Sequence, residues 1–247
     1  MDLCHVLSNT RITIVGPGRL GTALGAAMRA AGLDVAGPLG RGADGSGSDV
    51  VLLCVPDAEI AAAARVIRGE PLVGHTSGAT SLAALAPHEA FSLHPLLSVA
   101  KEGTQFRGAG CAVAGSTERA VQVATSLAEA LGMQPFAVAD ADRPLYHAAA
   151  AMASNYLVAL EAAAERLAGL AGVGRKHLAP LVRSAVDQWA DVGALDALTG
   201  PVARGDEETV ARQRSAVAAR AADMLPLWDT LTDATRTLAR SRTAASR

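Results

Sequence analysis

A glycine-rich turn between an apolar run and a helix-like segment constrains the fold of this chain more than any other feature. The segment RITIVGPGRLGTALGAAMRAAG places Gly16, Gly18 and Gly21 in GxGxxG spacing, directly after a strand-like run. Gly16 permits a tight turn, Gly18 lets a ligand approach the backbone, and Gly21 lets helix and strand pack closely. The N-terminus of such a helix offers free N–H groups to phosphate. The segment predicts a dinucleotide-binding turn; the alternative is a turn in a chain that is rich in glycine throughout.

The rest of the N-terminal half alternates strand-like and helix-like segments. Helical patterns occupy 20–31, 58–67 and 117–131. The strand-like segments lie at 11–15, 34–37, 49–55, 71–77, 90–94, 110–114 and 135–138. This alternation is typical of βαβ units. It predicts an α/β fold of the Rossmann type, with a mostly parallel, doubly wound sheet.

After the segment ADADRP at 139–144 the strand signals stop. Helical patterns follow at 145–171, 175–192, 207–224 and 225–240. We therefore expect a dinucleotide-binding domain over 1–139, an all-α substrate and dimerisation domain over 140–240, and a disordered tail over 241–247. Two such domains would form a ligand cleft where they meet.

Composition and charge exclude several classes of function. The net charge of −2, with both signs interspersed, gives no broad basic field for nucleic acid. Cys4, Cys54 and Cys111 form no CxxC pair, and the first residues lack signal-peptide features, so we expect a cytoplasmic protein. The longest weakly charged run, 144–160, is too short to span a bilayer, so no membrane partner is expected. The scattered histidines predict no metal site.

The end of the second strand bears on the choice between NAD and NADP. NAD sites commonly place an acid there to hold the ribose 2′-hydroxyl, but Asp34 begins this strand. The segment GPLGRG instead puts Arg41 where a 2′-phosphate would lie, and a guanidinium suits phosphate geometry. We therefore predict NADP(H) rather than NAD, with a solvated loop arginine as the alternative for Arg41. Arg19 either contacts phosphate or stays on the surface. The residues expected to bind the cofactor are Gly16, Pro17, Gly18, Arg19, Leu20, Gly21, Arg41, Val55, Pro56 and Ser77.

Three further segments end strands at the carboxyl edge of the predicted sheet, where ligands of open α/β folds bind. CVPD places Asp57 at a strand-to-helix turn, either as a helix N-cap or as a cofactor contact. HTSGA at 75–79 and LHPL at 93–96 make Ser77, Gly78 and His94 candidates for the cleft. His94 is equally open to a structural interpretation, and His75 is expected to be structural. HTSGA lacks the GxSxG elbow, which argues against a serine hydrolase.

The helical half contributes candidates for the substrate. On a helix over 145–171, His147, Ser154 and Asn155 share one face, and such a polar stripe needs partners. It either satisfies neighbouring backbone or lines the cleft, and we favour the cleft for His147 and Asn155. Arg204 either pairs with a neighbouring acid or holds an anionic substrate. Asp206 is expected to cap the helix that follows it.

Five segments together resemble one protein family. In chain order they are GPGRLG, HTSGA, FSLHPL, YHAAAAMASNYLVAL and ALTGPVARGD. They are similar to Rossmann-like proteins whose helical C-terminal domain has no assigned function. The resemblance covers about residues 11–239, and TGPVARGD is its most specific part. More distantly, the chain resembles the superfamily of 6-phosphogluconate dehydrogenase, ketopantoate reductase and pyrroline-5-carboxylate reductase.

The resemblance implies NADP-linked reduction of a small carbonyl or imine, often in a homodimer, and for some members ketopantoate reduction. Hydroxyacid members of the superfamily carry a catalytic lysine on the first helix of the second domain, with an asparagine four residues later. Here the corresponding stretch has His147, then Ala151, with Asn155 one turn further. A lysine-based mechanism is therefore not expected.

The leading hypothesis is NADPH-dependent reduction of a small 2-oxo acid, with 2-dehydropantoate as the best single candidate. Asn155 would polarise the carbonyl, His147 or His94 would give the proton, and Arg204 would hold the substrate carboxylate. One alternative is imine reduction like that of pyrroline-5-carboxylate reductase. Another is an NADP-binding sensor without turnover. The apolar second domain also favours a homodimer.

Overall fold

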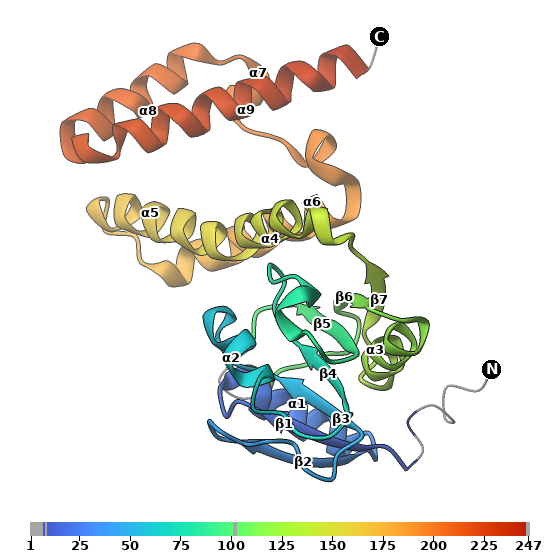
Figure 1. The fold of residues 1–247 in the computed structure, drawn as a ribbon. Helices are drawn as coiled ribbons and strands as arrows, with labels where there is room; N and C mark the ends of the chain where they lie inside the picture. The colour runs from blue at the N-terminus through green and yellow to red at the C-terminus, as the bar shows by residue number, and fades with distance from the viewer. Residues whose placement is uncertain (1–6, 8, 101–102, 246–247) are drawn as a thin grey trace. The chain divides into compact units, whose positions relative to one another are not determined.

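Seven strands form one sheet in the order β2-β1-β3-β4-β5-β6-β7 (Figure 1). They are β1 Arg11–Val15, β2 Asp34–Leu39, β3 Val50–Leu53, β4 Leu72–His75, β5 Ala90–Leu96, β6 Gly110–Gly115 and β7 Gln134–Ala137. Neighbouring strands are parallel except β5 and β6, which are antiparallel. The predicted α/β fold with a mostly parallel sheet is confirmed.

The computed structural model describes residue 7 and residues 9–100 and 103–245. It divides into two compact units, Met1–Ser154 and Asn155–Arg247. The sheet ends at Ala137, close to the predicted boundary after 139, while helix α4 (Arg143–Ala151) belongs to the first unit. The domain limits given by the sequence stay a prediction.

Both faces of the sheet are buried, which explains why its strands are almost continuously apolar. In β3, Val50 and Leu52 join one core cluster, and Val51 and Leu53 join the other. Helices α1 (Arg19–Ala30) and α3 (Glu118–Ala130) pack in the first cluster. The short helix α2 (Ile60–Ala64) and the 3-10 turn η3 (Leu82–Leu85) pack in the second. The sheet is therefore covered on both sides.

The helix predicted over 58–67 is shorter than its alanine-rich sequence indicated. A 3-10 turn, η2 (Asp57–Glu59), precedes α2, which ends at Ala64. Ile67 is then buried, and Gly69 has a φ of +78°. Burial of Ile67 and the turn at Gly69 end the helix at Ala64, three residues before the predicted limit at 67.

A π-helical segment interrupts the helix predicted over 145–171. After the 3-10 turn η4 (Asp140–Asp142), α4 runs to Ala151, the π segment η5 occupies Met152–Tyr156, and α5 spans Leu157–Leu170. A π turn holds more residues than an α turn, so the assumed α-helical spacing fails across it. The Oγ of Ser154 donates to the carbonyl of Ala150 at 2.8 Å, so this side chain bonds local backbone.

The second unit contains the remaining helices. They are α6 Arg175–Ala197, α7 Pro201–Arg204, α8 Glu207–Arg220, the 3-10 turn η6 Ala222–Met224 and α9 Leu225–Ala245. Gly193, with a φ of 78°, breaks α6 one residue after the predicted end at 192. Helix α9 reaches Ala245, which differs from the disorder predicted from 241 onward, and residues 246 and 247 lie outside the described ranges. The side chain of Arg242 helps to hold this end of α9 in place, because it donates to the carbonyl of Leu198.

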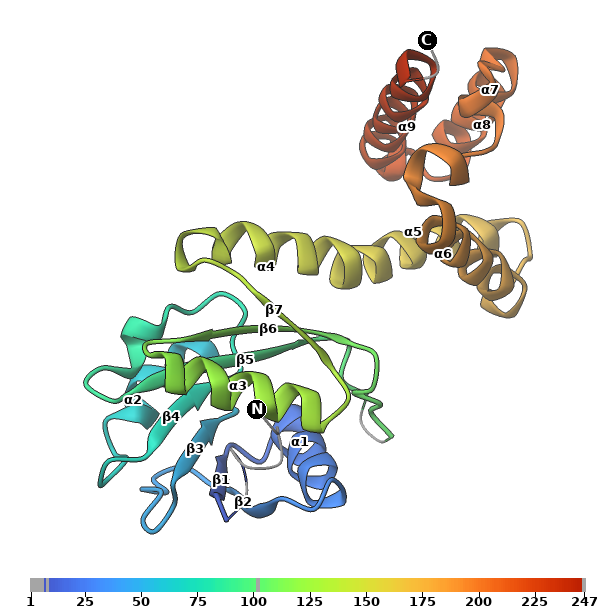
Figure 2. The same ribbon diagram turned by 90° about the vertical axis from the view of Figure 1, so that its right-hand side faces the viewer.

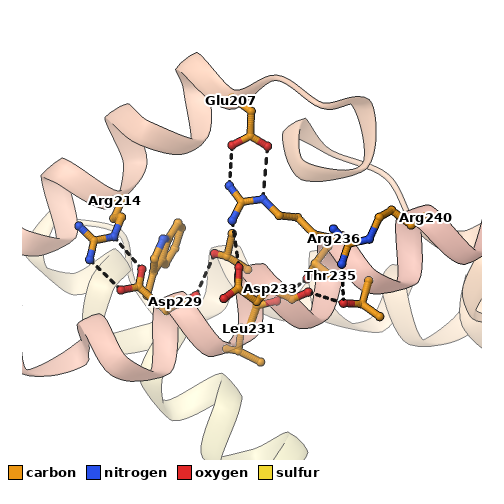
Figure 3. A network of polar contacts seen from close by, with 11 residues as sticks. Glu207, Arg214, Asp229, Leu231, Asp233, Thr235, Arg236 and Arg240 are labelled. Carbon is orange, nitrogen blue, oxygen red and sulfur yellow. Dashed lines mark hydrogen bonds and ion pairs between the residues drawn. The ribbon is translucent and has the colours of Figure 1, made fainter.

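Ion pairs join α8 to α9, which lie side by side (Figure 2). Arg214 binds both carboxylate oxygens of Asp229, at 2.8 and 2.7 Å. Arg236 binds Glu207 on α8 and Asp233 on its own helix (Figure 3). These bidentate pairs fix the register of the two helices, although exposed pairs add little stability.

Helices α5 and α6 contribute no buried residue. On α6, Leu181, Trp189 and Val192 are 67, 59 and 55% exposed. These side chains form an apolar surface on α6. Within the described residues, no helix combines the length and apolarity needed to cross a membrane.

Candidate functional site

The glycine-rich turn connects β1 to α1 and has the geometry that its spacing predicts. Gly16 has a φ of +115°, and a Cβ on it would lie 2.2 Å from the carbonyl oxygen of Cys54. A Cβ on Gly21 would lie 2.1 Å from the carbonyl oxygen of Gly16. At Gly18, by contrast, a Cβ would meet nothing within 4 Å. Gly16 and Gly21 are thus required by the fold, whereas Gly18 faces open space.

Helix α1 offers an uncapped N-terminus at this turn. Gly18 is its N-cap residue and has no side chain to accept a hydrogen bond, and its first turn contains no acidic residue. Free N–H groups and the positive end of the helix dipole therefore stay available to an anion. The cradle fits the phosphates of a dinucleotide.

A pocket of about 370 Å³ adjoins the turn. Its lining includes Gly16, Pro17, Gly18, Arg41, Val55 and Pro56, six of the ten residues predicted to bind the cofactor. Ala62, Ala63 and Val66 complete an apolar wall. Burial raises the pKa of the Cys54 thiol, which also lines the pocket, to about 12, so this wall is uncharged at neutral pH. The shape and lining suit an adenosine group.

Arg41 lies at the rim of this pocket and has a partner that the sequence did not indicate. Its Nη2 donates to Oε1 of Glu59 at 2.8 Å, and its side chain is 85% exposed. Glu59, in η2, lines the same pocket. An anion at the rim would therefore compete with Glu59 for the guanidinium.

The other predicted cofactor residues take different positions. Arg19 is exposed at the first position of α1. Leu20 is partly buried against the first core cluster. Ser77 is buried, and its Oγ donates to Oδ2 of Asp57 at 2.8 Å and accepts from the N–H of Thr80. Asp57 therefore does not cap η2, whose N-cap is Pro56, and the N-cap interpretation is corrected.

A cluster of rings stands at the end of β5. Nδ1 of His94 is 2.7 Å from the hydroxyl of Tyr146, and the two rings meet edge to face. The ring centroid of His147 lies 6.2 Å from that of His94. A Cβ on Gly78 would lie 2.8 Å from Cε1 of His94 and 3.0 Å from Cδ2 of His147. Three predicted cleft residues, Gly78, His94 and His147, are thus brought together.

Burial controls the protonation of this cluster. Desolvation, reinforced by the neighbouring His147 and Arg143, lowers the pKa of His94 to about 4. Desolvation also raises the pKa of the Tyr146 hydroxyl to about 12. At neutral pH, His94 is uncharged and Tyr146 keeps its proton.

Arg143 is buried close to this cluster, and the sequence analysis did not single it out. Its side chain is 2% exposed, and it donates to Oδ1 of Asp140 at 2.7 Å and to Oγ of Ser92 at 2.5 Å. Tyr146 was missed too, although it adjoins His147. The sequence could have pointed to Tyr146 only if the orientation of α4 against β5 had been known. His75 is fully buried and accepts from the N–H of Ser77, in agreement with the structural role expected for it.

Two predicted substrate residues belong to the second unit. Asn155 lies in the π segment and is exposed. Arg204 ends α7 and is exposed. Hydrogen bonding with Thr209 lowers the pKa of Asp206, and the charge of Arg204 acts in the same direction to a smaller extent. Asp206 caps α8 by accepting from the N–H of Thr209 at 3.0 Å, which confirms the predicted N-cap. Their roles toward a substrate stay predictions. The described residues contain no group of three or more metal-ligating side chains.

A defined family matches residues 109–235 of the 247, and its description is "domain of unknown function (DUF2520)". The chain belongs to the DUF2520 family. This confirms the resemblance to a family whose helical C-terminal domain has no assigned function. A search of curated protein sequences finds no match for this DUF2520 protein.

Solved structures resemble the DUF2520 protein over nearly its whole length. The protein TM1727 of Thermotoga maritima is 23% identical with a TM-score of 0.78, covering 94% of this chain and 99% of that one. A Bacteroides fragilis protein, provisionally assigned as an NADP oxidoreductase, is 17% identical with a TM-score of 0.79 and the same coverage. The NADP-bound pyrroline carboxylate reductase of Plasmodium falciparum is 12% identical with a TM-score of 0.60, again covering 94% and 99%. At these identities the likeness establishes the fold.

Proposed function

We propose that this protein is an NADPH-dependent oxidoreductase that reduces a small 2-oxo acid, with 2-dehydropantoate as the best single candidate. One observation carries the proposal: chemically suited residues lie after three adjacent strands and near the end of a fourth, along one edge of the sheet. They are the glycine turn after β1, Val55 to Asp57 after β3, Ser77 and Gly78 after β4, and His94 on β5. The Ser77–Asp57 hydrogen bond links the middle two. Such an edge is where dinucleotides lie in open α/β folds.

The residues of the first unit fit the cofactor. The uncapped start of α1 would bind the pyrophosphate, the apolar pocket the adenosine, and Arg41 the 2′-phosphate. The bound nicotinamide supplies hydride. The NADP oxidoreductases and reductases among the structural neighbours support this choice of cofactor.

The side chains near His94 would act on the substrate. His94 and His147 are the two candidates to deliver a proton to the carbonyl oxygen. Asn155 would polarise that carbonyl, and Arg204 would hold the carboxylate of the substrate. Because His94 is uncharged at neutral pH, it would act as a neutral hydrogen-bond donor rather than as an imidazolium.

Imine reduction is the second candidate. The chain has no lysine between 143 and 170, and a protonated imine needs no strong general acid to accept hydride. Pyrroline-5-carboxylate reductases and a reductive aminase from Aspergillus terreus crystallised with NADPH share the fold. These observations favour a substrate whose carbon–nitrogen double bond already carries the proton.

Steady-state oxidation of NADPH by the purified protein tests both candidates. 2-Dehydropantoate and 1-pyrroline-5-carboxylate are supplied separately, with NADH in parallel and a control lacking substrate. Saturable, NADPH-preferring turnover of the oxo acid supports the leading proposal, and turnover of the imine alone moves the assignment to the second. Tight NADPH binding without turnover of either would overturn both and favour the sensor hypothesis.

A further inference from the structure

The hydrogen bond between Tyr146 and His94 assigns a role to a residue outside the predicted site, and this role rests on the proposed function. We propose that Tyr146 is a positioning residue that holds His94 in its Nε2–H tautomer and replaces the proton that His94 passes to the substrate oxygen. His94 then need not be charged before hydride transfer.

The chemistry of the two groups sets the direction of this hydrogen bond. A phenol is a stronger donor than a neutral imidazole N–H, and an unprotonated ring nitrogen is a stronger acceptor than a phenol oxygen. At 2.7 Å, the Tyr146 hydroxyl therefore donates to Nδ1 of His94. The proton of the neutral ring must then lie on Nε2. Within the described residues, the hydrogen bond of Nδ1 to Tyr146 is the one that His94 forms, so the N–H at Nε2 is left for a ligand.

The surroundings keep His94 neutral and its ring fixed. Gly78 leaves no space for a side chain beside Cε1, and Tyr146 stands edge-on to the ring. Arg143 and His147 disfavour an added proton, whereas Asp57 acts weakly in the opposite sense. The imidazole is therefore a rigid neutral donor aimed by Tyr146.

The proposed step balances without a charged acid. Hydride adds to the carbonyl carbon, and the carbon–oxygen π electrons move to the oxygen. That oxygen takes the proton from Nε2 of His94, while Nδ1 takes the hydroxyl proton of Tyr146. The products are an alcohol, neutral His94 in its other tautomer and a tyrosinate. Tyr146 is only partly buried, so water can return its proton, after which His94 reverts to its first tautomer.

Arg143 makes the transient tyrosinate less costly. Its positive charge lowers the pKa of Tyr146, in opposition to desolvation and to Cys111. The guanidinium is held by Asp140 and Ser92, so it cannot turn away as charge develops. The alkoxide formed by hydride addition is a stronger base than the tyrosinate, so the transfer runs downhill.

Nitrogen-15 NMR of histidine in the resting protein tests the tautomer without substrate or cofactor. The expected spectrum at pH 7 shows His94 with Nε2 protonated and Nδ1 bare, assigned by the loss of its signals in His94→Gln. Tyr146→Phe keeps the ring but removes the donor, and should give a mixture of tautomers. The matched control is Tyr156→Phe, because Tyr156 is the only other tyrosine and is 64% exposed. Protonated Nδ1 in the wild type, or an unchanged pattern in Tyr146→Phe, overturns the proposal.

Kinetics of the same variant test the proton transfer. Loss of a positioned proton donor typically costs about 100-fold or more, so Tyr146→Phe should lower kcat to that extent while KM changes little. Unchanged kcat overturns the transfer. If the wild type reduces no substrate, the proposed function and the transfer fail together, whereas the NMR result still decides the tautomer.

Discussion

At the scale of single residues, the glycines of the turn fall into two kinds: those that the fold itself requires and one that only a ligand would require. Gly16 and Gly21 have backbone atoms where a Cβ would go, but Gly18 has free space. The same motif thus holds two structural glycines and one that only a bound molecule would require.

Substitution at two of these glycines distinguishes the two roles. Gly18→Ala should leave the thermal midpoint within about 2 °C of wild type, because its Cβ meets no atom. It should nevertheless weaken NADPH binding at least about 10-fold by obstructing the pyrophosphate. Gly21→Ala should lower the midpoint by several degrees, because its Cβ collides with the carbonyl of Gly16. Calorimetry and fluorescence titration measure both quantities, and equal NADPH affinity in Gly18→Ala would contradict the cofactor assignment.

Arg41 and Glu59 should have opposite effects on the choice of cofactor. A hydrogen bond to a charged group is worth about 1.5–3 kcal/mol, so Arg41→Ala should weaken NADPH binding about 10- to 100-fold and leave NADH binding unchanged. Glu59→Gln removes the competing carboxylate and should tighten NADPH binding up to about 5-fold, the range of an exposed ion pair. Titration with both cofactors measures this, and equal losses for NADPH and NADH in Arg41→Ala would argue against a 2′-phosphate contact.

At the scale of elements, helix α6 carries an unusual arrangement of charge. Its N-terminal half holds Arg175, Lys176 and Arg183, and its C-terminal half holds three aspartates, at 187, 191 and 196. This order opposes the helix dipole, which favours acids at the start and bases at the end. A second copy packed antiparallel would match each half with its opposite charge and cover the exposed apolar residues. The homodimer expected from the sequence stays a prediction, and α6 is its proposed contact.

Breaking that contact should produce a monomer. Trp189→Lys places a charge among the exposed apolar residues of α6 and should weaken self-association by at least about 30-fold, the loss of an interface hot spot. Gln122→Lys is the control, because Gln122 is exposed on helix α3 of the first unit and is no part of the proposed contact. Sedimentation velocity over a range of concentrations measures both. A monomeric wild type, or a dimer that survives Trp189→Lys, would refute the contact.

At the scale of the whole molecule, the sequence predicted the fold better than the site. Apolar runs and glycine spacing predict where the strands lie in the chain and where the cofactor turn lies, because both depend on local pattern. The antiparallel direction of β6 relative to β5 and the π segment after Ala151 have no such local signature. Tyr146 and Arg143 act through contacts with β5, about 50 residues away in the chain, which no local pattern reveals.

Stability of the fold should depend on pH through two histidines. Burial lowers the pKa of both His75 and His94 to about 4, against about 6.5 in an unfolded chain. Between these values the unfolded chain binds more protons, so the free energy of unfolding should fall as pH drops from about 7 toward 4. The stability that depends on keeping His75 and His94 neutral is fully present above about pH 6.5. The hydrogen bond with Ser81 and the ion pair with Arg143 lower the pKa of Asp140, so the stabilisation from this carboxylate is lost only at still lower pH.

Denaturant midpoints at pH 7.5 and 5 measure this dependence. His94→Gln should flatten it, because one of the two protonation sites is gone, while His177→Gln, at an exposed position on α6, should follow the wild type. Equal midpoints for the wild-type protein at both pH values would contradict the burial argument.

Both tryptophans, Trp189 on α6 and Trp228 on α9, belong to the second unit, and the first has none. Intrinsic emission excited at 295 nm therefore reports on the helical half alone. Trp189, 59% exposed in the single chain, should emit at long wavelength when the chain is dilute and shift to shorter wavelength as copies associate. The first unit, which holds the glycine turn, gives no tryptophan emission. Emission near 450 nm from a bound reduced nicotinamide would therefore report on that unit separately.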